Sequence, residues 1–177
     1  DVFIKGEEFY IDSVNRHQDT VWVVYKGYNV RPQGFRKDLY AQNIMAKPIT
    51  GPLFNLHQLK GKYVLLDFWG TWCAPCIDLI PKLKELHQQY AAKGLVMVSI
   101  ANDRKDSYDK LQKIIREYGM DWTQLFDNQV EPGNISAQYD VTCFPTSVLI
   151  DPEGKIIFRS CGKDDFEALQ KIIKELI

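Results

Sequence analysis

The chain contains two cysteines separated by two residues, Cys73 and Cys76, directly after a short apolar segment, residues 63–69. That segment contains one acid, Asp67. Thiols at this spacing can close a small disulfide ring, and their thiolates can exchange with disulfides elsewhere. A carboxyl in an apolar segment costs stability, which makes an accidental placement unfavourable. These three residues therefore indicate thiol–disulfide exchange coupled to proton transfer.

The elements around the cysteines assign each a role. Residues 63–69 predict a strand buried on both faces, and the apolar spacing after Cys76 predicts a helix up to Tyr90. Cys73 then lies at the helix N-terminus, where free N–H groups and the helix dipole stabilise a thiolate. Cys76 lies one turn further in and is expected to be more buried. We predict that Cys73 attacks a substrate disulfide and that Cys76 resolves the mixed disulfide.

Asp67 is predicted to supply the proton chemistry. Burial within the strand should raise the pKa of its carboxyl. A carboxyl with a pKa near neutral can take the proton from Cys76 when that thiol must attack. The alternative is an aspartate at the solvent-exposed end of the strand, paired locally.

The remaining pattern predicts an α/β fold with a mixed central sheet and helices on both faces. Further strands are expected at residues 95–100, 146–150 and 155–161, and helices at 107–118, 135–139 and from 164 onward. A loop is expected between Gly119 and the helix at 135–139. Residues 1–47 differ in character and predict a β-rich N-terminal extension with two strands, of which 21–25 is the stronger. We therefore divide the chain into an extension, 1–47, and a domain, 48–177.

Composition excludes several classes of function. The chain has 22 Lys and Arg against 23 Asp and Glu, so it lacks the basic surplus of a nucleic-acid-binding protein. No apolar run approaches the length of a membrane span. The chain begins at Asp1, so we expect that any export signal or lipid anchor has been removed. Four cysteines are too few to hold together a fold of 177 residues, so we assign them to chemistry.

Residues from about 48 to the C-terminus resemble the thioredoxin superfamily, and more closely the TlpA/ResA-like thiol-disulfide oxidoreductases. The resemblance is carried by "VLLDFWGTWCAPC" and "YDVTCFPTSVLIDPEGKIIFR". It implies a thioredoxin-like fold and reduction of disulfides in extracytoplasmic proteins, in the bacterial periplasm or on a membrane anchor facing it. It also implies that Pro145 is a cis-proline and that the backbone at Phe144 pairs with an extended substrate peptide. Trp72, Ala74 and Pro75 complete the implied substrate-binding surface. The implied partners are protein disulfides and an upstream thiol electron donor, for which the membrane is one location, and no cofactor is expected.

The chain differs from this family in the acidic residues near the cysteine pair. ResA-like members carry a glutamate three residues beyond the second cysteine, where this chain has Leu79. Asp78 is adjacent but lies elsewhere on a helix surface. The proton-transfer role therefore falls to Asp67, at a position where many TlpA-like proteins have asparagine.

Two further cysteines, Cys143 and Cys161, lie in the last predicted hairpin. Counting back from the turn "DPEG" places Cys161 almost opposite Phe144 and therefore near Cys143. A second disulfide is one outcome, and two free, half-buried thiols lining the substrate surface are the outcome we favour. Free thiols there would affect regulation or oxidation, or simply pack as small apolar groups.

Two other functions compete with this interpretation. A thiol peroxidase of the peroxiredoxin type shares the fold, but those enzymes have threonine three residues before the reactive cysteine, where this chain has Gly70. A metal-binding module is also conceivable, because Cys73 and Cys76 have the spacing of a zinc knuckle. Cys143 and Cys161 do not form a second knuckle, and the three histidines are assigned to the surface or to loops: His17, His57 and His87. The sequence does not indicate the oligomeric state.

Overall fold

The computed structural model describes residues 2–4, 7–14, 21–25, 39–128 and 134–177, and divides the chain into two compact units, Asp1–Gly34 and Phe35–Ile177. The first unit contains three antiparallel strands in the order β1-β2-β3, with bounds Val2–Ile4, Glu7–Val14 and Val21–Tyr25. The predicted strand at 21–25 is confirmed, and β1 is additional. The predicted division between residues 47 and 48 stays a prediction.

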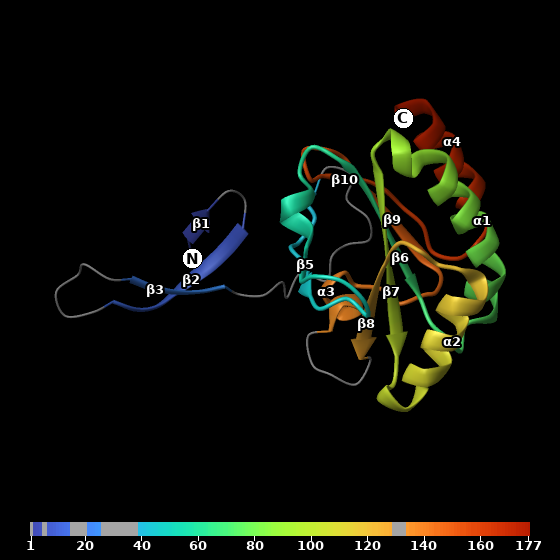
Figure 1. The fold of residues 1–177 in the computed structure, drawn as a ribbon. Coiled ribbons are helices and arrows are strands. Elements are labelled where there is room, and N and C mark those ends of the chain that lie inside the picture. The colour runs from blue at the N-terminus through green and yellow to red at the C-terminus, as the bar shows by residue number, and fades with distance from the viewer. Residues whose placement is uncertain (1, 5–6, 15–20, 26–38, 129–133) are drawn as a thin grey trace. The chain divides into compact units, whose positions relative to one another are not determined.

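The second unit is built on a five-stranded sheet with the order β10-β9-β6-β7-β8 (Figure 1). Strands β6, β7 and β8 are parallel, and β9 and β10 are antiparallel to their neighbours. The strand bounds are β6 Tyr63–Trp69, β7 Leu95–Asp103, β8 Thr123–Asn128, β9 Thr146–Ile150 and β10 Ile156–Arg159. A separate two-stranded sheet pairs β4, Met45–Ala46, with β5, Phe54–Asn55. The α/β fold class is confirmed.

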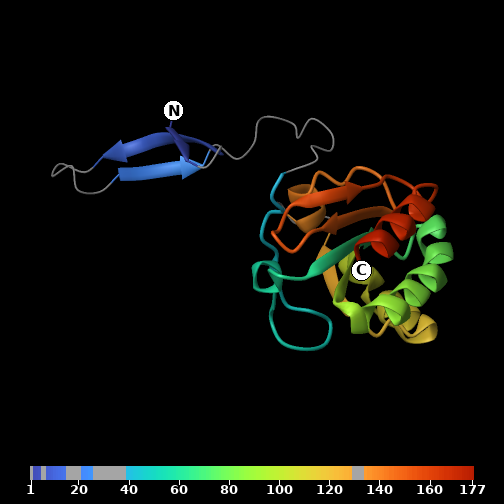
Figure 2. The ribbon, with the colours of Figure 1, turned by 90° about the horizontal axis from the view of Figure 1, so that it is seen from above.

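Helices cover both faces of this sheet, as Figures 1 and 2 show. Helices α1, α2 and α4 lie on one face, and α3 lies on the other with β4 and β5. Their bounds are α1 Ala74–Tyr90, α2 Tyr108–Tyr118, α3 Ile135–Gln138 and α4 Phe166–Leu176. Three short 3₁₀ segments accompany them: η1 Leu56–Leu59, η2 Ala91–Lys93 and η3 Lys105–Ser107. Within the described residues, no helix is both long enough and apolar enough to cross a bilayer.

Strand β6 is buried on both faces because it lies in the middle of the sheet. Successive side chains of a strand point to opposite faces. Leu65 and Trp69 join the apolar cluster beneath α1, α2 and α4, whereas Leu66 and Phe68 join the cluster on the α3 face. Asp67 has the same parity as Leu65 and Trp69. The acid therefore points to the face on which α1, the helix of the two cysteines, is packed.

Strand β8 was missed in the sequence, where this segment was assigned to a loop. Its residues Gln124, Asp127 and Asn128 are polar but buried, which hides the strand pattern. Asp127 accepts hydrogen bonds from the backbone N–H groups of Ile135 and Ser136, at 2.7 and 2.8 Å. The buried polar side chain thus anchors the start of α3, a tertiary role that composition does not reveal.

Candidate active site

Cys73 and Cys76 form a disulfide with an S–S distance of 2.03 Å and a Cα–Cα distance of 5.3 Å. Cys73 is the N-cap residue of α1, and the N–H group of Cys76 donates a hydrogen bond to Cys73 Sγ at 3.3 Å. Pro75 lies in the first turn of α1, where backbone N–H groups have no acceptor within the helix, so the lack of an N–H group at proline costs no hydrogen bond. The predicted position of Cys73 at the helix N-terminus is confirmed.

Cys76 is the more buried of the two cysteines, as the sequence predicted, but the difference is small. Cys73 is 4% exposed and Cys76 is 2% exposed, so both are covered in the disulfide form. The asymmetry between them is electrostatic, because the N–H group at the start of α1 points at Cys73 Sγ. Trp72, Ala74 and Pro75 around them are exposed.

Asp67 is buried, which excludes the alternative of an aspartate at a solvent-exposed strand end. Its side chain is 2% exposed, and burial raises the pKa of the carboxyl from 3.8 to about 7. The hydroxyl of Ser99 donates a hydrogen bond to Asp67 Oδ2 at 2.9 Å, which lowers this pKa against the larger effect of burial. Asp67 Oδ1 is buried without a hydrogen-bond partner among the described residues.

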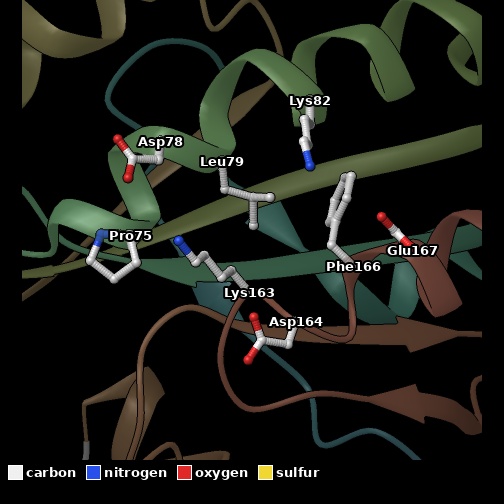
Figure 3. Close-up of a pocket in the computed structure, with 8 residues that line it drawn as sticks. All are labelled: Pro75, Asp78, Leu79, Lys82, Lys163, Asp164, Phe166 and Glu167. Atoms are coloured by element: carbon white, nitrogen blue, oxygen red, sulfur yellow. The ribbon is translucent and has the colours of Figure 1, made fainter.

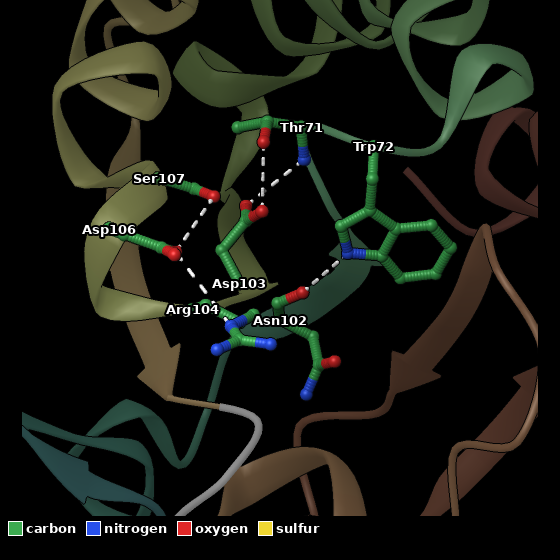
Figure 4. A network of polar contacts seen from close by, with 7 residues as sticks. All are labelled: Thr71, Trp72, Asn102, Asp103, Arg104, Asp106 and Ser107. Atoms are coloured by element: carbon green, nitrogen blue, oxygen red, sulfur yellow. Dashed lines mark hydrogen bonds and ion pairs between the residues drawn. The ribbon is translucent and has the colours of Figure 1, made fainter.

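The loop that leads into the cysteine pair is held by the carboxyl end of β7 (Figure 4). Asp103, fully buried, accepts hydrogen bonds from the backbone N–H group of Thr71 at 3.0 Å and from its hydroxyl at 2.8 Å. The indole N–H group of Trp72 donates to the carbonyl of Asn102 at 2.9 Å. A Cβ at Gly70 would lie 2.6 Å from that indole nitrogen, so any larger residue there would displace the ring of Trp72. Residues 70–72 are thus fixed before the chain reaches the first cysteine.

The segment before β9 supplies a second wall of the site. The Phe144–Pro145 peptide bond is cis, as the family resemblance implied. The ring of Phe144 meets the ring of Trp72 edge-on, with 5.2 Å between the centroids, and Trp72 is 54% exposed. The structure therefore brings the residue before the cis-proline against the residue before Cys73, although 72 positions separate Trp72 from Phe144 in sequence.

Cys143 and Cys161 also form a disulfide, with a Cα–Cα distance of 5.8 Å. The interpretation that we favoured, two free thiols, is therefore wrong. The register that we predicted for the hairpin was also wrong. Strand β10 contains an irregularity between Ile156 and Phe158, which shifts its pairing with β9. As a result the N–H group of Gly162 donates to the carbonyl of Pro145, at 2.7 Å.

A cleft of about 430 Å³ lies beside the cysteine pair, between α1 and the start of α4 (Figure 3). Leu79, at the position where ResA-like proteins have glutamate, lines this cleft and is buried. Asp78 is exposed at the cleft. The remaining lining residues carry charges of both signs beside apolar rings: Pro75, Lys82, Lys163, Asp164, Phe166 and Glu167. The cleft thus offers no buried acid in place of the missing glutamate.

Three residues of the site were not singled out in the sequence: Ser99, Asp103 and Trp122. Ser99 and Asp103 are polar residues in or at the end of an apolar run, the same signal that drew attention to Asp67. Their partners became clear only from the parallel register of β6 and β7, which pairs Asp67 with Ser99. In the part of the chain that the structure describes, no three His, Cys, Asp or Glu residues are grouped as metal ligands.

The fold and the cysteine pair define a thioredoxin-like thiol-disulfide oxidoreductase, and comparisons with known proteins agree. Residues 40–159 match the model of the AhpC/TSA family, and the chain belongs to this family. It is 30% identical over 155 residues to the thiol-disulfide oxidoreductase ResA of Bacillus thuringiensis subsp. konkukian, covering 88% of this chain and 87% of that protein. It is 31% identical over 137 residues to the thioredoxin-like protein YneN of Bacillus subtilis, covering 77% and 78%.

Solved structures give the same result. A protein from Chlorobium tepidum assigned as the thiol:disulfide interchange protein DsbE aligns with a TM-score of 0.71 at 31% identity, over 79% of this chain and 96% of that chain. The thioredoxin domain of a thiol-disulfide oxidoreductase from Bacteroides vulgatus aligns with a TM-score of 0.67 at 28% identity, over 78% and 99%. The predicted ResA-like thiol-disulfide oxidoreductase is thereby confirmed, and the thiol peroxidase alternative is not favoured.

Proposed function

We propose that this oxidoreductase works as a reductase of protein disulfides, with Cys73 as the nucleophile and Cys76 as the resolving thiol. The observation that carries the proposal is the hydrogen bond from the N–H group of Cys76 to Cys73 Sγ at the N-cap of α1. A donor and a helix N-terminus aimed at one sulfur stabilise negative charge there in preference to the other. Cys73 is therefore the thiol that ionises first once the disulfide is opened.

The reaction then proceeds in two exchanges. The Cys73 thiolate forms a bond to one sulfur of the substrate disulfide, and the other substrate sulfur leaves as a thiolate and takes a proton from water. Cys76 gives its proton to a base and its thiolate attacks Cys73 Sγ. The bond between Cys73 and the substrate breaks, and the second substrate sulfur leaves as a thiolate and takes a proton from water. The substrate gains two electrons and two protons, and the chain is left with the Cys73–Cys76 disulfide. A thiol electron donor must reduce this disulfide before the next cycle.

Asp67 is the proposed acid and base for the second exchange. A carboxyl with a pKa of about 7 is partly ionised near neutral pH, so it can accept the proton of Cys76 and later return it. Its position on the α1 face of β6 supports this role. Leu79 and the exposed Asp78 do not offer a competing buried carboxyl.

The proposed substrate is a polypeptide bound in extended form along the backbone at Phe144. The surface around it combines the exposed Trp72, Ala74 and Pro75 with the cis peptide bond before Pro145. The edge-on contact between Trp72 and Phe144 gives this surface an aromatic rim beside the disulfide. Residues 48–177 would suffice for this chemistry, with 1–47 as a β-rich extension.

We place the protein outside the cytoplasm, in the periplasm or on a membrane anchor facing it, with a thiol donor in the membrane. The Cys143–Cys161 disulfide supports this, because a disulfide outside the reactive pair persists most readily in an oxidising compartment. The couple is expected in the reducing half of the range of about −270 to −120 mV, since neither Ala74 nor Pro75 adds charge between the cysteines. A strongly oxidising pair after equilibration with glutathione would contradict the assignment as a reductase.

Trapping tests the roles of the two cysteines. A Cys76→Ser variant expressed in the source cell should accumulate substrates as mixed disulfides on Cys73, and mass spectrometry of the adducts names the substrates and their compartment. The matched Cys73→Ser variant should trap none of them. Adducts on Cys143 or Cys161, or equal trapping by both variants, would refute the assignment.

A further inference from the structure

Asp67 is the end of a hydrogen-bonded chain that begins at Trp122. The indole N–H group of Trp122 donates to Ser99 Oγ at 2.8 Å, and Ser99 Oγ lies 2.9 Å from Asp67 Oδ2. All three side chains are buried, at 7%, 0% and 2% exposure. Ser99 is the register partner of Asp67 on the neighbouring parallel strand, so both side chains point to the same face of the sheet.

The chemistry of these groups fixes the direction of both hydrogen bonds. An indole N–H group can only donate, so Ser99 Oγ must accept from Trp122. The hydroxyl has a single proton, and Asp67 Oδ2 is the acceptor in reach. Ser99 therefore accepts from Trp122 and donates its one proton to Asp67 Oδ2. A proton on Oδ2 would be repelled by the proton that Ser99 donates to the same oxygen. We therefore place the acid proton on Oδ1, the buried oxygen without a partner among the described residues.

We propose that Ser99, oriented by Trp122, is a positioning residue that sets the proton affinity of Asp67 and directs its acid proton to Oδ1. The inference rests on the proposed function of Asp67 in proton transfer and specifies how that proton is placed. Trp122 acts only through Ser99, since its N–H group orients the hydroxyl and does not itself contact the carboxyl. Without the indole, the Ser99 hydroxyl could rotate and accept a hydrogen bond from the protonated carboxyl of Asp67.

Side chains from the neighbouring strands and helix also surround the hydrogen-bonded series of Trp122, Ser99 and Asp67. On β9, the register partner of Asp67 is Ser147, which does not titrate. At the start of α1, Cys73 and Cys76 become free thiols once the disulfide opens, and α1 also carries His87. On the far side of Trp122, His87 packs its ring 5.3 Å from the indole ring and lies 3.3 Å from a carboxylate oxygen of Asp121. In the disulfide form the two thiols do not contribute to the titration. A His87→Gln variant removes the contribution of the imidazole.

The pKa of Asp67 can be measured directly in the oxidised protein by carboxyl ¹³C NMR, with the signal assigned by its loss in Asp67→Asn. Ser99→Ala removes the donor to the carboxylate, so the pKa of Asp67 should rise by about one unit. Trp122→Phe should also raise it, because the freed hydroxyl can then stabilise the neutral acid. Ser99→Thr, which keeps a hydroxyl, should hold the pKa near that of the unmodified protein.

The double variant provides the decisive comparison. If Trp122 acts through Ser99, Trp122→Phe should have no further effect on the pKa in a Ser99→Ala background. Infrared spectroscopy adds a test of proton placement: the carbonyl stretch of protonated Asp67 should move to higher frequency in Ser99→Ala, because Oδ2 then loses the donor. An unchanged pKa in Ser99→Ala, additive effects in the double variant or an unmoved carbonyl stretch would overturn the proposal.

These readouts do not depend on catalysis, so they separate this inference from the proposed function. If Asp67 is the acid and base, the pH profile of mixed-disulfide resolution should move with its pKa in Ser99→Ala. A shifted pKa with an unshifted pH profile would remove Asp67 from the mechanism but leave the role of Ser99 intact. An unshifted pKa would refute the role of Ser99 whatever the activity.

Discussion

Replacing Asp67 with asparagine should make the protein more stable at alkaline pH and slower in catalysis. The substitution keeps the size of the side chain, exchanges one carboxyl oxygen for an amide NH2 group, and removes the capacity to ionise and carry an acid proton. In the folded disulfide form, burial raises the pKa of Asp67 from 3.8 to about 7. Above that pH the fold must hold a carboxylate at a site that favours the neutral acid, and the asparagine variant carries no such charge.

The sign and size of the stability effect follow from this shift. Because the folded pKa lies above the unfolded one, the favourable contribution is fully present below pH 3.8 and is lost as the pH rises through about 7. One pKa unit corresponds to about 1.4 kcal/mol, so the full effect is about 4 kcal/mol. Between pH 5 and pH 8 the unmodified protein should lose about 2–3 kcal/mol of unfolding free energy relative to Asp67→Asn.

Urea unfolding of both oxidised proteins, measured from pH 5 to pH 9, provides the test. The difference in unfolding free energy should grow with pH and level off above pH 8. In parallel, rapid quenching with a thiol-alkylating reagent should show the mixed disulfide on Cys73 accumulating in the reduced variant, since loss of a general base slows its step by about 10²-fold or more. Parallel stability curves would refute the buried, perturbed carboxyl, and unslowed resolution would refute its catalytic role.

Two further predictions concern the surroundings of the reactive pair. Asp103→Ala should lower the unfolding free energy by about 1–3 kcal/mol and speed hydrogen exchange at the Thr71 amide, because it leaves two buried donors without their acceptor; an unchanged exchange rate would argue against this anchor. Replacing Cys143 and Cys161 together by serine should cost about 3 kcal/mol through the loss of a cross-link spanning 18 residues, while the cysteine pair at 73–76 still reduces disulfides. Peptide mapping under non-reducing conditions checks the cross-link itself, and loss of all reductase activity in a folded variant would assign those cysteines to the catalytic cycle.

The stability of the site and its activity are expected to oppose each other. Asp67 Oδ1 is buried without a partner among the described residues, and the adjacent chain of Trp122 and Ser99 supplies only one donor to the carboxyl. A site optimised for stability would satisfy both oxygens or replace the acid by an apolar residue. The retained cost is consistent with a group that must gain and lose a proton during the reaction.

The sequence by itself determined the reactive pair, the strand and helix on either side of it, and the burial of Asp67. These features are local: the two-residue spacing, the apolar run at 63–69 and the helical spacing after Cys76 all lie within 30 residues. Strand β8 escaped because three of its six side chains are polar but buried, and the partners of Asp127 lie in α3 and β7, which no local pattern shows.

Only the tertiary structure decided which distant residues serve the site. The parallel pairing of β6 with β7 brings Ser99 to Asp67, a separation of 32 positions, and the structure joins Cys143 to Cys161 in a disulfide that the sequence had left open. A register shift of one residue moves a side chain to the opposite face of a sheet, and periodicity along a single strand carries no record of its partner's register. The sequence therefore predicted the thiol–disulfide chemistry, whereas the side chains that contact the carboxyl of Asp67 were identified only from the tertiary structure.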